Sequence, residues 1–149
     1  MPITLSVKRK AGCEDLPLPR YMSEAAAGMD VCAAVDGPVA VAPGEIKLIP
    51  TGLYVAVPTG YEIQVRPRSG LALKHGLTIV NAPGTIDADY RGEVGIIVGN
   101  IGREPFVITR GMRIAQLVVA SVARAEVEVV NELPDSRRGE GGFGHSGTH

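Results

Sequence analysis

The stretch GTIDADYRGEVG, residues 84–95, gathers groups that could do chemistry. It places two carboxylates, Asp87 and Asp89, and one of only four tyrosines, Tyr90, between glycines. An aspartate is ionised near neutral pH and can take a proton from a positioned water molecule, and glycine lets a ligand approach the backbone closely. The stretch is either a tight turn between two strands or the floor of a pocket that carries a catalytic base.

The stretch RPRSGLA, residues 66–72, is a candidate anion site. Pro67 restricts the backbone before a short helix, Ser69 is placed to cap that helix, and Gly70 leaves its backbone open to a ligand. Free N–H groups at a helix start, with Arg68 beside them, attract an anion. The alternative is a capped helix with a surface arginine.

Two polar residues interrupt apolar strands. Asp30 stands in AAAGMDVCAA, and Gln116 stands in RIAQLVVASVA. A charge in such a strand is usually paired or lies at a strand end. An amide there either faces solvent or points into a site, and neither residue decides between these alternatives by itself.

The segment RRGEGGFGHSGTH, residues 137–149, differs in composition from the rest of the chain. It contains five glycines and one aromatic residue, Phe143. It lacks the Lys-Ser/Thr ending of a phosphate-binding loop of the Walker type, but its backbone N–H groups, Arg138 and the hydroxyl of Ser146 suit closure over an anion. A lid is therefore expected, and a disordered tail is the alternative.

Composition excludes several classes of function. The chain has 149 residues, a formal net charge of −1 and no apolar run near the roughly 18 residues that span a bilayer. We expect a cytoplasmic protein that binds neither a membrane nor a nucleic-acid polymer. Cys13 and Cys32 lack the spacing of a metal site or disulfide framework, and the three histidines lack that of a zinc site. A small anionic ligand remains open, because a few arginines suffice for it.

The elements that must position these residues are short strands. Nineteen glycines and eleven prolines divide the chain into apolar segments rich in Val and Ile. One short helix is expected, at Ser69–His75, in an all-β sandwich, barrel or jelly roll with a β domain over residues 1–136 and a flexible lid over residues 137–149. Strands are expected near Ile3–Val7, Gly28–Ala34, Val39–Ala42, Glu45–Ile49, Tyr54–Val57, Tyr61–Val65, Leu77–Val80, Glu93–Val98, Phe106–Thr109, Arg113–Val122 and Glu126–Val129.

The segments IKLIP and IAQLVVASVA break the expected alternation of apolar and polar residues. A nearly continuous apolar strand indicates burial on both faces, and in a small sheet protein another subunit can cover the second face. The pattern favours a homo-oligomer.

Five stretches in this order resemble the motifs of the trimeric deoxyuridine triphosphatase (dUTPase) family: AAAGMDVCAA, RPRSGLA, NAPGTIDADYRGEVG, RGMRIAQLVV and RGEGGFGHSG. The resemblance runs from about residue 25 to residue 147. It implies a jelly-roll subunit in a homotrimer with three active sites, each built from all three chains. It also implies hydrolysis of dUTP to dUMP and pyrophosphate, with Mg²⁺ carried on the triphosphate. Such an enzyme keeps uracil out of DNA and supplies dUMP for thymidylate synthesis.

The resemblance also implies roles for individual residues. Asp87 matches the family's water-activating base, and Tyr90 matches the ring that stacks on deoxyribose and leaves no room for a 2′-hydroxyl. Asp30 matches an aspartate on the metal and phosphate side. The uracil slot corresponds to the backbone of a hairpin that includes Asn81, Gly84, Ile86 and Gly95.

The remaining matches concern the triphosphate and the lid. Phosphate ligands correspond to Arg68, Ser69, Gly70 and Gln116. In the tail, Phe143 matches an aromatic residue that lies over the uracil ring, while Arg138 and Ser146 match lid contacts to the phosphates. Three positions depart from the family pattern: Met29, Met112 and His145.

Two alternatives remain. A dCTP deaminase shares the fold that the resemblance implies and resembles these motifs. Such an enzyme needs a glutamate three residues before the asparagine that ends the strand, and Ile97 stands there, before Asn100. A non-catalytic β module would use the fold only as a scaffold. The presence of Asp87, Arg68 and the tail favours an enzyme over such a module.

Overall fold

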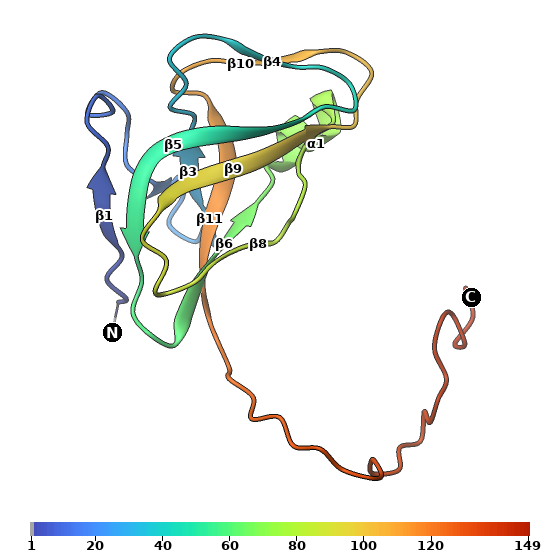
Figure 1. Cartoon of the computed structure of the whole chain (residues 1–149). Coiled ribbons are helices and arrows are strands. Elements are labelled where there is room, and N and C mark those ends of the chain that lie inside the picture. The colour runs from blue at the N-terminus through green and yellow to red at the C-terminus, as the bar shows by residue number, and fades with distance from the viewer. Residues whose placement is uncertain (1) are drawn as a thin grey trace.

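The computed structural model describes residues 2–149, and its regular structure is almost entirely β (Figure 1). The order of strands in the first sheet, sheet A, is β1 (Ser6–Arg9), β5 (Ile46–Ala56), β9 (Glu93–Asn100) and β7 (Leu77–Ile79). In sheet B the order is β2 (Arg20–Tyr21), β3 (Met29–Cys32), β11 (Arg113–Ser121), β6 (Tyr61–Arg66) and β8 (Gly84–Ile86). A small third sheet pairs β10 (Phe106–Ile108) with β4 (Val39–Val41), and the helix α1 spans Ser69–His75.

Sheets A and B face each other across one aliphatic core. Ile49 of β5 and Ile96 of β9 meet Ile63 of β6 and Leu117 of β11 there, and each is at most 1% exposed. Each such side chain stabilises the fold by roughly 1.5–3 kcal/mol through burial. The expected all-β, jelly-roll class is confirmed, and so is the helix at Ser69–His75.

The segments expected as Glu45–Ile49 and Tyr54–Val57 form one strand, β5, which bulges between Pro50 and Tyr54. The Thr51 hydroxyl donates to Val94 O at 2.5 Å, and Gly52, with φ of 66°, donates its N–H to Glu93 Oε1 at 3.0 Å. Bonds to β9 therefore carry the chain through a turn signal without ending the strand. The strands β2 and β8 were not expected, because two or three residues are too few to show alternation.

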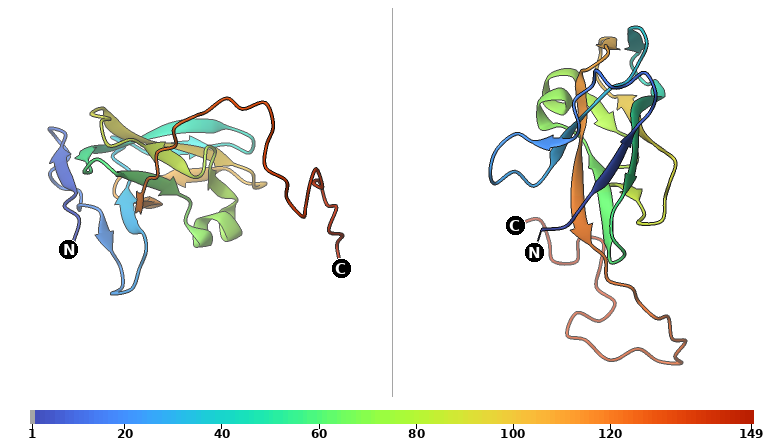
Figure 2. Two further views of the ribbon diagram at one scale, coloured as in Figure 1. Left: turned by 90° about the horizontal axis from the view of Figure 1, so that it is seen from below. Right: turned by 90° about the vertical axis from the view of Figure 1, so that its left-hand side faces the viewer.

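The strand expected at Glu126–Val129 was a wrong prediction. These residues have no regular structure, and Val127 and Val129 are 89% and 94% exposed. Their alternation is that of a strand, but a strand needs a hydrogen-bonded neighbour, and none of residues 2–149 supplies one. After β11 the chain leaves the body, and the right-hand view in Figure 2 shows the C-terminal segment extending away from the sheets.

The predicted cap of α1 was also wrong. The N-cap residue is Arg68, which makes no side-chain cap hydrogen bond, and Ser69 is already helical. In the described part of the chain this helix of seven residues is the only one, and it is far too short to cross a bilayer.

An ion pair fastens the N-terminal loop to the sheets. The Arg110 guanidinium donates to Asp15 Oδ2 at 2.9 Å and to Asp15 Oδ1 at 2.7 Å, and also to Gly12 O at 2.7 Å. The hydrogen bonds from Arg110 lower the pKa of the Asp15 carboxyl below its usual range. The same loop packs Cys13 and Leu16 against the body.

Asp15→Asn is expected to lower the urea midpoint slightly near pH 7, and the difference from the wild type should shrink as the pH falls below the ordinary aspartate range. Because the folded-state pKa of Asp15 is depressed, its stabilising effect is full above the unfolded aspartate pKa of about 3.9 and is lost as the pH falls through the folded value. Urea unfolding across this range checks the expectation, with the exposed Asp36→Asn as control. A difference that does not shrink as the pH falls would contradict the linkage.

Candidate active site

A cluster of charged and polar side chains lies on the outer face of sheet B, centred on Asp30 of β3. We call Asp30, Arg68, Arg113 and Gln116 the Asp30 cluster. Asp30 is only 5% exposed. Its Oδ2 accepts a hydrogen bond from Arg113 Nη1 at 2.9 Å and lies 3.5 Å from Arg68 Nη2, while Oδ1 accepts from Gln116 Nε2 at 3.3 Å. Arg68 Nη1 also donates to Arg113 O at 3.1 Å. Two residues predicted in isolation, Asp30 and Gln116, are therefore in direct contact.

A β-bulge in β11 explains why Arg113 reaches this cluster. The register against β3 shifts between Arg113 and Ala115, so that Ile114 is the extra residue. Ile114 and Ala115 are both buried, although they are consecutive. The bulge therefore turns Arg113 and Gln116, three residues apart, to the same face of the sheet. Regular alternation would separate them, which is why sequence reasoning missed Arg113.

The Asp30 cluster carries a surplus of positive charge, since two guanidinium groups surround one carboxylate. A buried carboxylate is stable only when it is paired, and here the pairing also fixes the planar groups of Arg68 and Arg113. Both arginines stay partly exposed, with side chains 27% and 43% accessible. Guanidinium groups held in this way suit a phosphate-bearing ligand.

The start of α1 adjoins the cluster. Ser69 and Gly70 are exposed directly after Arg68, and a Cβ on Gly70 would have no neighbour within 4 Å. Nearby, a shallow depression is lined by the side chains of β6 and Gln116 on one side and by the turn before β8 on the other, namely Gln64, Arg66, Pro67, Ala82, Pro83 and Gln116. Sequence reasoning had no role for Arg66, whose guanidinium donates to Gln64 Oε1 at 2.6 and 3.1 Å.

The turn at residues 81–84 is tight. Its Ala82–Pro83 bond is cis. A Cβ on Gly84 would lie 3.1 Å from Asn81 Nδ2 and 3.2 Å from Val65 Cβ. A side chain at position 84 would therefore be tightly packed against the Asn81 amide, and the turn brings these two predicted slot residues together.

The hairpin expected around residues 84–95 is absent. Strand β8 pairs with β6 in sheet B, whereas β9 pairs with β5 and β7 in sheet A. The intervening residues cross from one sheet to the other, because Ile86 and Val94 each enter the core from a different layer. Gly84 and Gly95 consequently stand in different sheets, and Leu48 covers Gly95.

This crossing segment carries the predicted base. Asp87 and Asp89 are both exposed, and the Tyr90 N–H donates to Asp87 O at 3.1 Å. The Tyr90 ring is 45% exposed, and its hydroxyl donates to Glu93 O at 3.0 Å. A Cβ on residue 92 would collide with this ring, so Gly92 is what allows the ring to fold back.

One chain does not bring all predicted site residues together. Along β6, Gln116 lies opposite Arg66, but Ile86, next to Asp87, lies opposite Ile63. These two levels are three residue steps apart along β6, which corresponds to roughly 10 Å. The tail is farther away still: Figure 1 shows it clear of the sheets, and Phe143 is fully exposed. Within the tail, Arg138 Nε donates to Gly141 O, and a hollow is lined by Arg137, Arg138, His145 and Ser146.

The side chains of the Asp30 cluster suit a metal ion only when the metal ion arrives bound to the ligand. Among residues 2–149, no group of three or more His, Cys, Asp or Glu side chains is arranged to hold a metal. Asp30 is a single carboxylate whose two oxygens already accept from cationic or amide groups. Mg²⁺ commonly keeps several waters and binds one or two carboxylates together with substrate phosphates, which is compatible with one nearby aspartate.

Two departures from the expected motifs also have places in the structure. Met29 is buried in the core and Met112 packs against it, so both serve packing. Both cysteines are buried and free, and burial raises the pKa of the Cys32 thiol.

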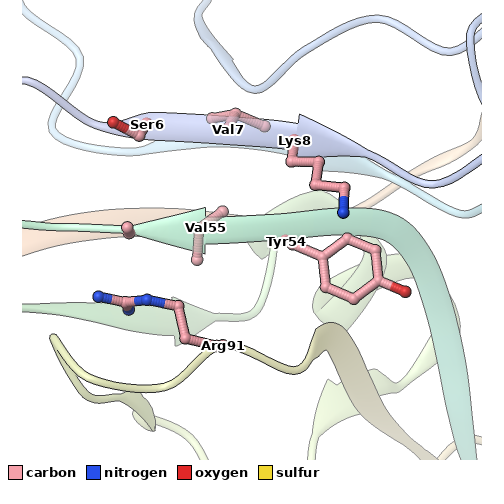
Figure 3. A pocket seen from close by; sticks show the side chains of 7 residues that line it. Ser6, Val7, Lys8, Tyr54, Val55 and Arg91 are labelled. Atoms are coloured by element: carbon pink, nitrogen blue, oxygen red, sulfur yellow. The ribbon is translucent and has the colours of Figure 1, made fainter.

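A second hollow lies on sheet A, away from the Asp30 cluster. Lys8 and Val7 of β1, Tyr54 and Val55 of β5, and Arg91 line it together with Ser6 and Ala56 (Figure 3). The Lys8 Nζ atom stands 5.6 Å from the centre of the Tyr54 ring. None of the predicted site residues lines this hollow.

Comparison with known proteins matches the family model described as dUTPase over residues 14–147. Two relatives carry the name deoxyuridine 5′-triphosphate nucleotidohydrolase. The protein from Caldanaerobacter subterraneus subsp. tengcongensis is 54% identical and covers 99% of both chains, and that from Desulfotalea psychrophila is 63% identical over 90% of this chain and 89% of its own.

Solved structures agree with these relatives. The dUTPase of Staphylococcus bacteriophage 80alpha with dUpNHpp has a TM-score of 0.84 and 31% identity, and covers 97% of this chain and 99% of its own. A mutant dUTPase from phage phi11 of S. aureus, described as coordinating a structural Mg(II) ion, has a TM-score of 0.78 and 26% identity, and covers 89% and 99%.

Proposed function

Because the chain belongs to the dUTPase family, we infer that it hydrolyses dUTP to dUMP and pyrophosphate. It is a dUTP diphosphatase, and in the cell it removes dUTP and forms dUMP. The observation that carries this conclusion is the family match over nearly the whole chain, together with a cationic cluster suited to a polyphosphate. The two free, buried cysteines and a nucleotide substrate support a cytoplasmic location.

We propose that Asp87 is the general base. A water molecule attacks the α-phosphorus of dUTP, its proton passes to the Asp87 carboxylate, and the bond between the α-phosphorus and the bridging oxygen breaks to release pyrophosphate. Asp87 suits this role because it is exposed at the end of β8, where a ligand can reach it. The rest of the catalysis is positioning and neutralisation of charge.

The triphosphate is proposed to bind at the Asp30 cluster and the start of α1. Arg68 and Gln116 would contact phosphate oxygens directly, and Ser69 and Gly70 would add a hydroxyl and backbone N–H groups. The contacts of Asp30 with Arg68, Arg113 and Gln116 support this proposal, because they fix these donors before the ligand arrives.

The base and the sugar are proposed to bind near the 81–84 turn and the crossing segment. The tight turn between Asn81 and Gly84 supports a narrow slot for uracil. Ile86 follows in β8 and would extend the slot, whereas Gly95 stands in sheet A and is the proposed slot residue that one chain does not place beside the turn. Tyr90 would stack on the deoxyribose and exclude a 2′-hydroxyl. Its ring supports this role because it is half exposed and anchored through its hydroxyl.

Mg²⁺ is the proposed cofactor, carried on the triphosphate. When bound, it would neutralise phosphate charge. Asp30 is the carboxylate nearest to the proposed phosphate ligands, and it would contact the metal indirectly because its own oxygens are occupied by Arg113 and Gln116.

We propose a homotrimer with sites shared between subunits. The separation of Asp87, the Asp30 cluster and Phe143 in one chain supports this arrangement. The outer face of sheet A is apolar, with Ile46 and Leu48 60% and 68% exposed, and burial against a second copy would remove this surface from water.

The segment 122–136 supports the same assembly. Its exposed Val127 and Val129 alternate with Glu126 and Glu128, so one face is apolar and the other is acidic. The hollow beside the edge strand β1 offers the partly exposed Val7 beside the cations Lys8 and Arg91 (Figure 3), a complementary surface on a neighbouring subunit. The segment would carry residues 137–149 to that subunit, where they are proposed to close as a lid.

The proposed function predicts a sharp nucleotide preference. Purified protein with Mg²⁺ should release pyrophosphate from dUTP at least about 100-fold more efficiently than from UTP, dTTP or dCTP, since a slot closed to a substituent excludes it strongly. Steady-state pyrophosphate release measures this. Comparable rates on dUTP and UTP would contradict the role of Tyr90, and release of ammonia from dCTP would indicate a deaminase instead.

A further inference from the structure

Glu93, the first residue of β9, joins three segments that are distant in sequence. Its Oε1 accepts the Gly52 N–H at 3.0 Å, inside the β5 bulge, and its Oε2 accepts from Lys10 Nζ at 3.1 Å. The side chain is only 24% exposed. Gly52 O in turn accepts the Lys10 N–H at 2.8 Å. The carboxylate therefore ties the start of β9 to the bulge and to the N-terminal loop.

The backbone of the same residue holds the proposed sugar-selecting ring. Glu93 O accepts the Tyr90 hydroxyl at 3.0 Å, and this is the hydrogen bond that the ring makes within residues 2–149. Gly92 lies under the ring and leaves it free to tilt, because a side chain at position 92 would collide with the ring and fix it. The direction of the ring therefore depends on where the Glu93 carbonyl stands.

Other contacts restrict the position of the Glu93 carbonyl, but only in part. The neighbouring Val94 O accepts the Thr51 hydroxyl, and Val94 itself is buried. The register of β9 against β5 shifts between Pro50 and Tyr54, so that Glu93 pairs with Tyr54 while residues 51–53 form the bulge beside it. The side chain of Glu93 adds a bond to the bulge itself, because it accepts the Gly52 N–H.

We propose that Glu93 is a positioning residue for the discrimination between deoxyribose and ribose. Its carboxylate clamps β9 to the β5 bulge and thereby fixes the carbonyl that anchors the Tyr90 hydroxyl. The inference rests on the proposed role of Tyr90 and adds a residue that never touches the nucleotide. The amide hydrogen bond from Gly52 matters more than the Lys10 ion pair, because an exposed ion pair contributes little.

The test compares the ratio of kcat/KM for dUTP to kcat/KM for UTP in Glu93→Ala, Glu93→Gln and Lys10→Met. Glu93→Ala should lower this ratio by about 3- to 10-fold, the equivalent of one lost hydrogen bond. Glu93→Gln retains an acceptor for Gly52 and should stay within about twofold of the wild type, as should Lys10→Met. If the alanine variant does not fold, Glu93→Asp, too short to reach Gly52, replaces it.

A purely structural role gives a different result. Thermal stability would fall and kcat/KM would drop equally for dUTP and UTP, so the ratio would not change, and this outcome would overturn the inference. Tyr90→Phe, combined with Glu93→Ala, completes a double-mutant cycle. The ratio of kcat/KM for dUTP to kcat/KM for UTP in the double variant should be no lower than in either single variant. Tyr90→Ala separates the two proposals: an unchanged ratio there would refute the role of Tyr90 itself.

Discussion

Replacing Asp87 with asparagine lowers the turnover of dUTP by roughly 10²–10⁴-fold and leaves nucleotide binding largely intact. Asparagine keeps the size of the side chain but cannot take the proton of the attacking water, and a lost general base has an effect of this order. Because Asp87 is exposed and holds the segment only through its backbone, the fold should not change. Pyrophosphate release gives kcat, and titration with dUpNHpp gives affinity.

Asp89→Asn is the matched control. This second aspartate is also exposed, two residues farther along the same segment. The substitution removes the same charge, so a similar loss of turnover in both variants would indicate a general effect of charge rather than a base at Asp87. Unchanged turnover in Asp87→Asn would remove Asp87 from its proposed role.

Deleting residues 137–149 is expected to reduce turnover on the order of 100-fold or more without unfolding the protein. The tail would close over the bound nucleotide and exclude bulk water. Without it the reacting groups would lose their alignment, and a loss of alignment has an effect of this size. The described tail residues are almost all exposed and form no part of the core, so the thermal midpoint should stay the same. Measurements of turnover and of thermal unfolding of the truncated chain check the expected loss of activity and the expected unchanged midpoint.

Mixing the two variants tests the shared site directly. If a tail closes over the site of a neighbour, trimers assembled from Asp87→Asn chains and truncated chains contain some sites with both an intact base and an intact tail. Activity should then rise above the sum of the separate proteins after unfolding and joint refolding. Activity equal to the sum of the two separate proteins would contradict sites built from several chains. A protein that light scattering shows to be a monomer and that is fully active would contradict them as well.

Most of the fold was predictable because its signals are local. Strands such as Tyr61–Arg66 and Phe106–Ile108 show alternation between turn residues, and α1 fits between Pro67 and Gly76. The wrong prediction at Glu126–Val129 has a different origin. Its alternation is real, but the strand it describes needs a hydrogen-bonding partner, and residues 2–149 do not provide one.

The sequence indicated individual site residues better than their neighbours. Asp30 and Gln116 were both singled out, and the structure places them in contact. Their partner Arg113 was missed because an unpredicted bulge changes the face on which it lies. Glu93 was missed because its role depends on a β5 bulge more than 40 positions away in sequence, and no periodicity shows such a contact. The catalytic and binding roles themselves stay predictions until the variants are measured.

The bulge in β11 also bears on how such a chain can evolve. Ile114 and Leu117 can exchange with other aliphatic residues at modest cost, since a core tolerates substitutions that conserve volume. Loss of a single residue at the bulge would be far more damaging than any of these exchanges. It would turn Arg113 away from Asp30 while Gln116 stayed in place, so one codon's deletion would dismantle the cationic cluster and leave the aliphatic pattern of the strand nearly untouched. Selection must therefore preserve the number of residues in β11 more strictly than the identity of its aliphatic residues.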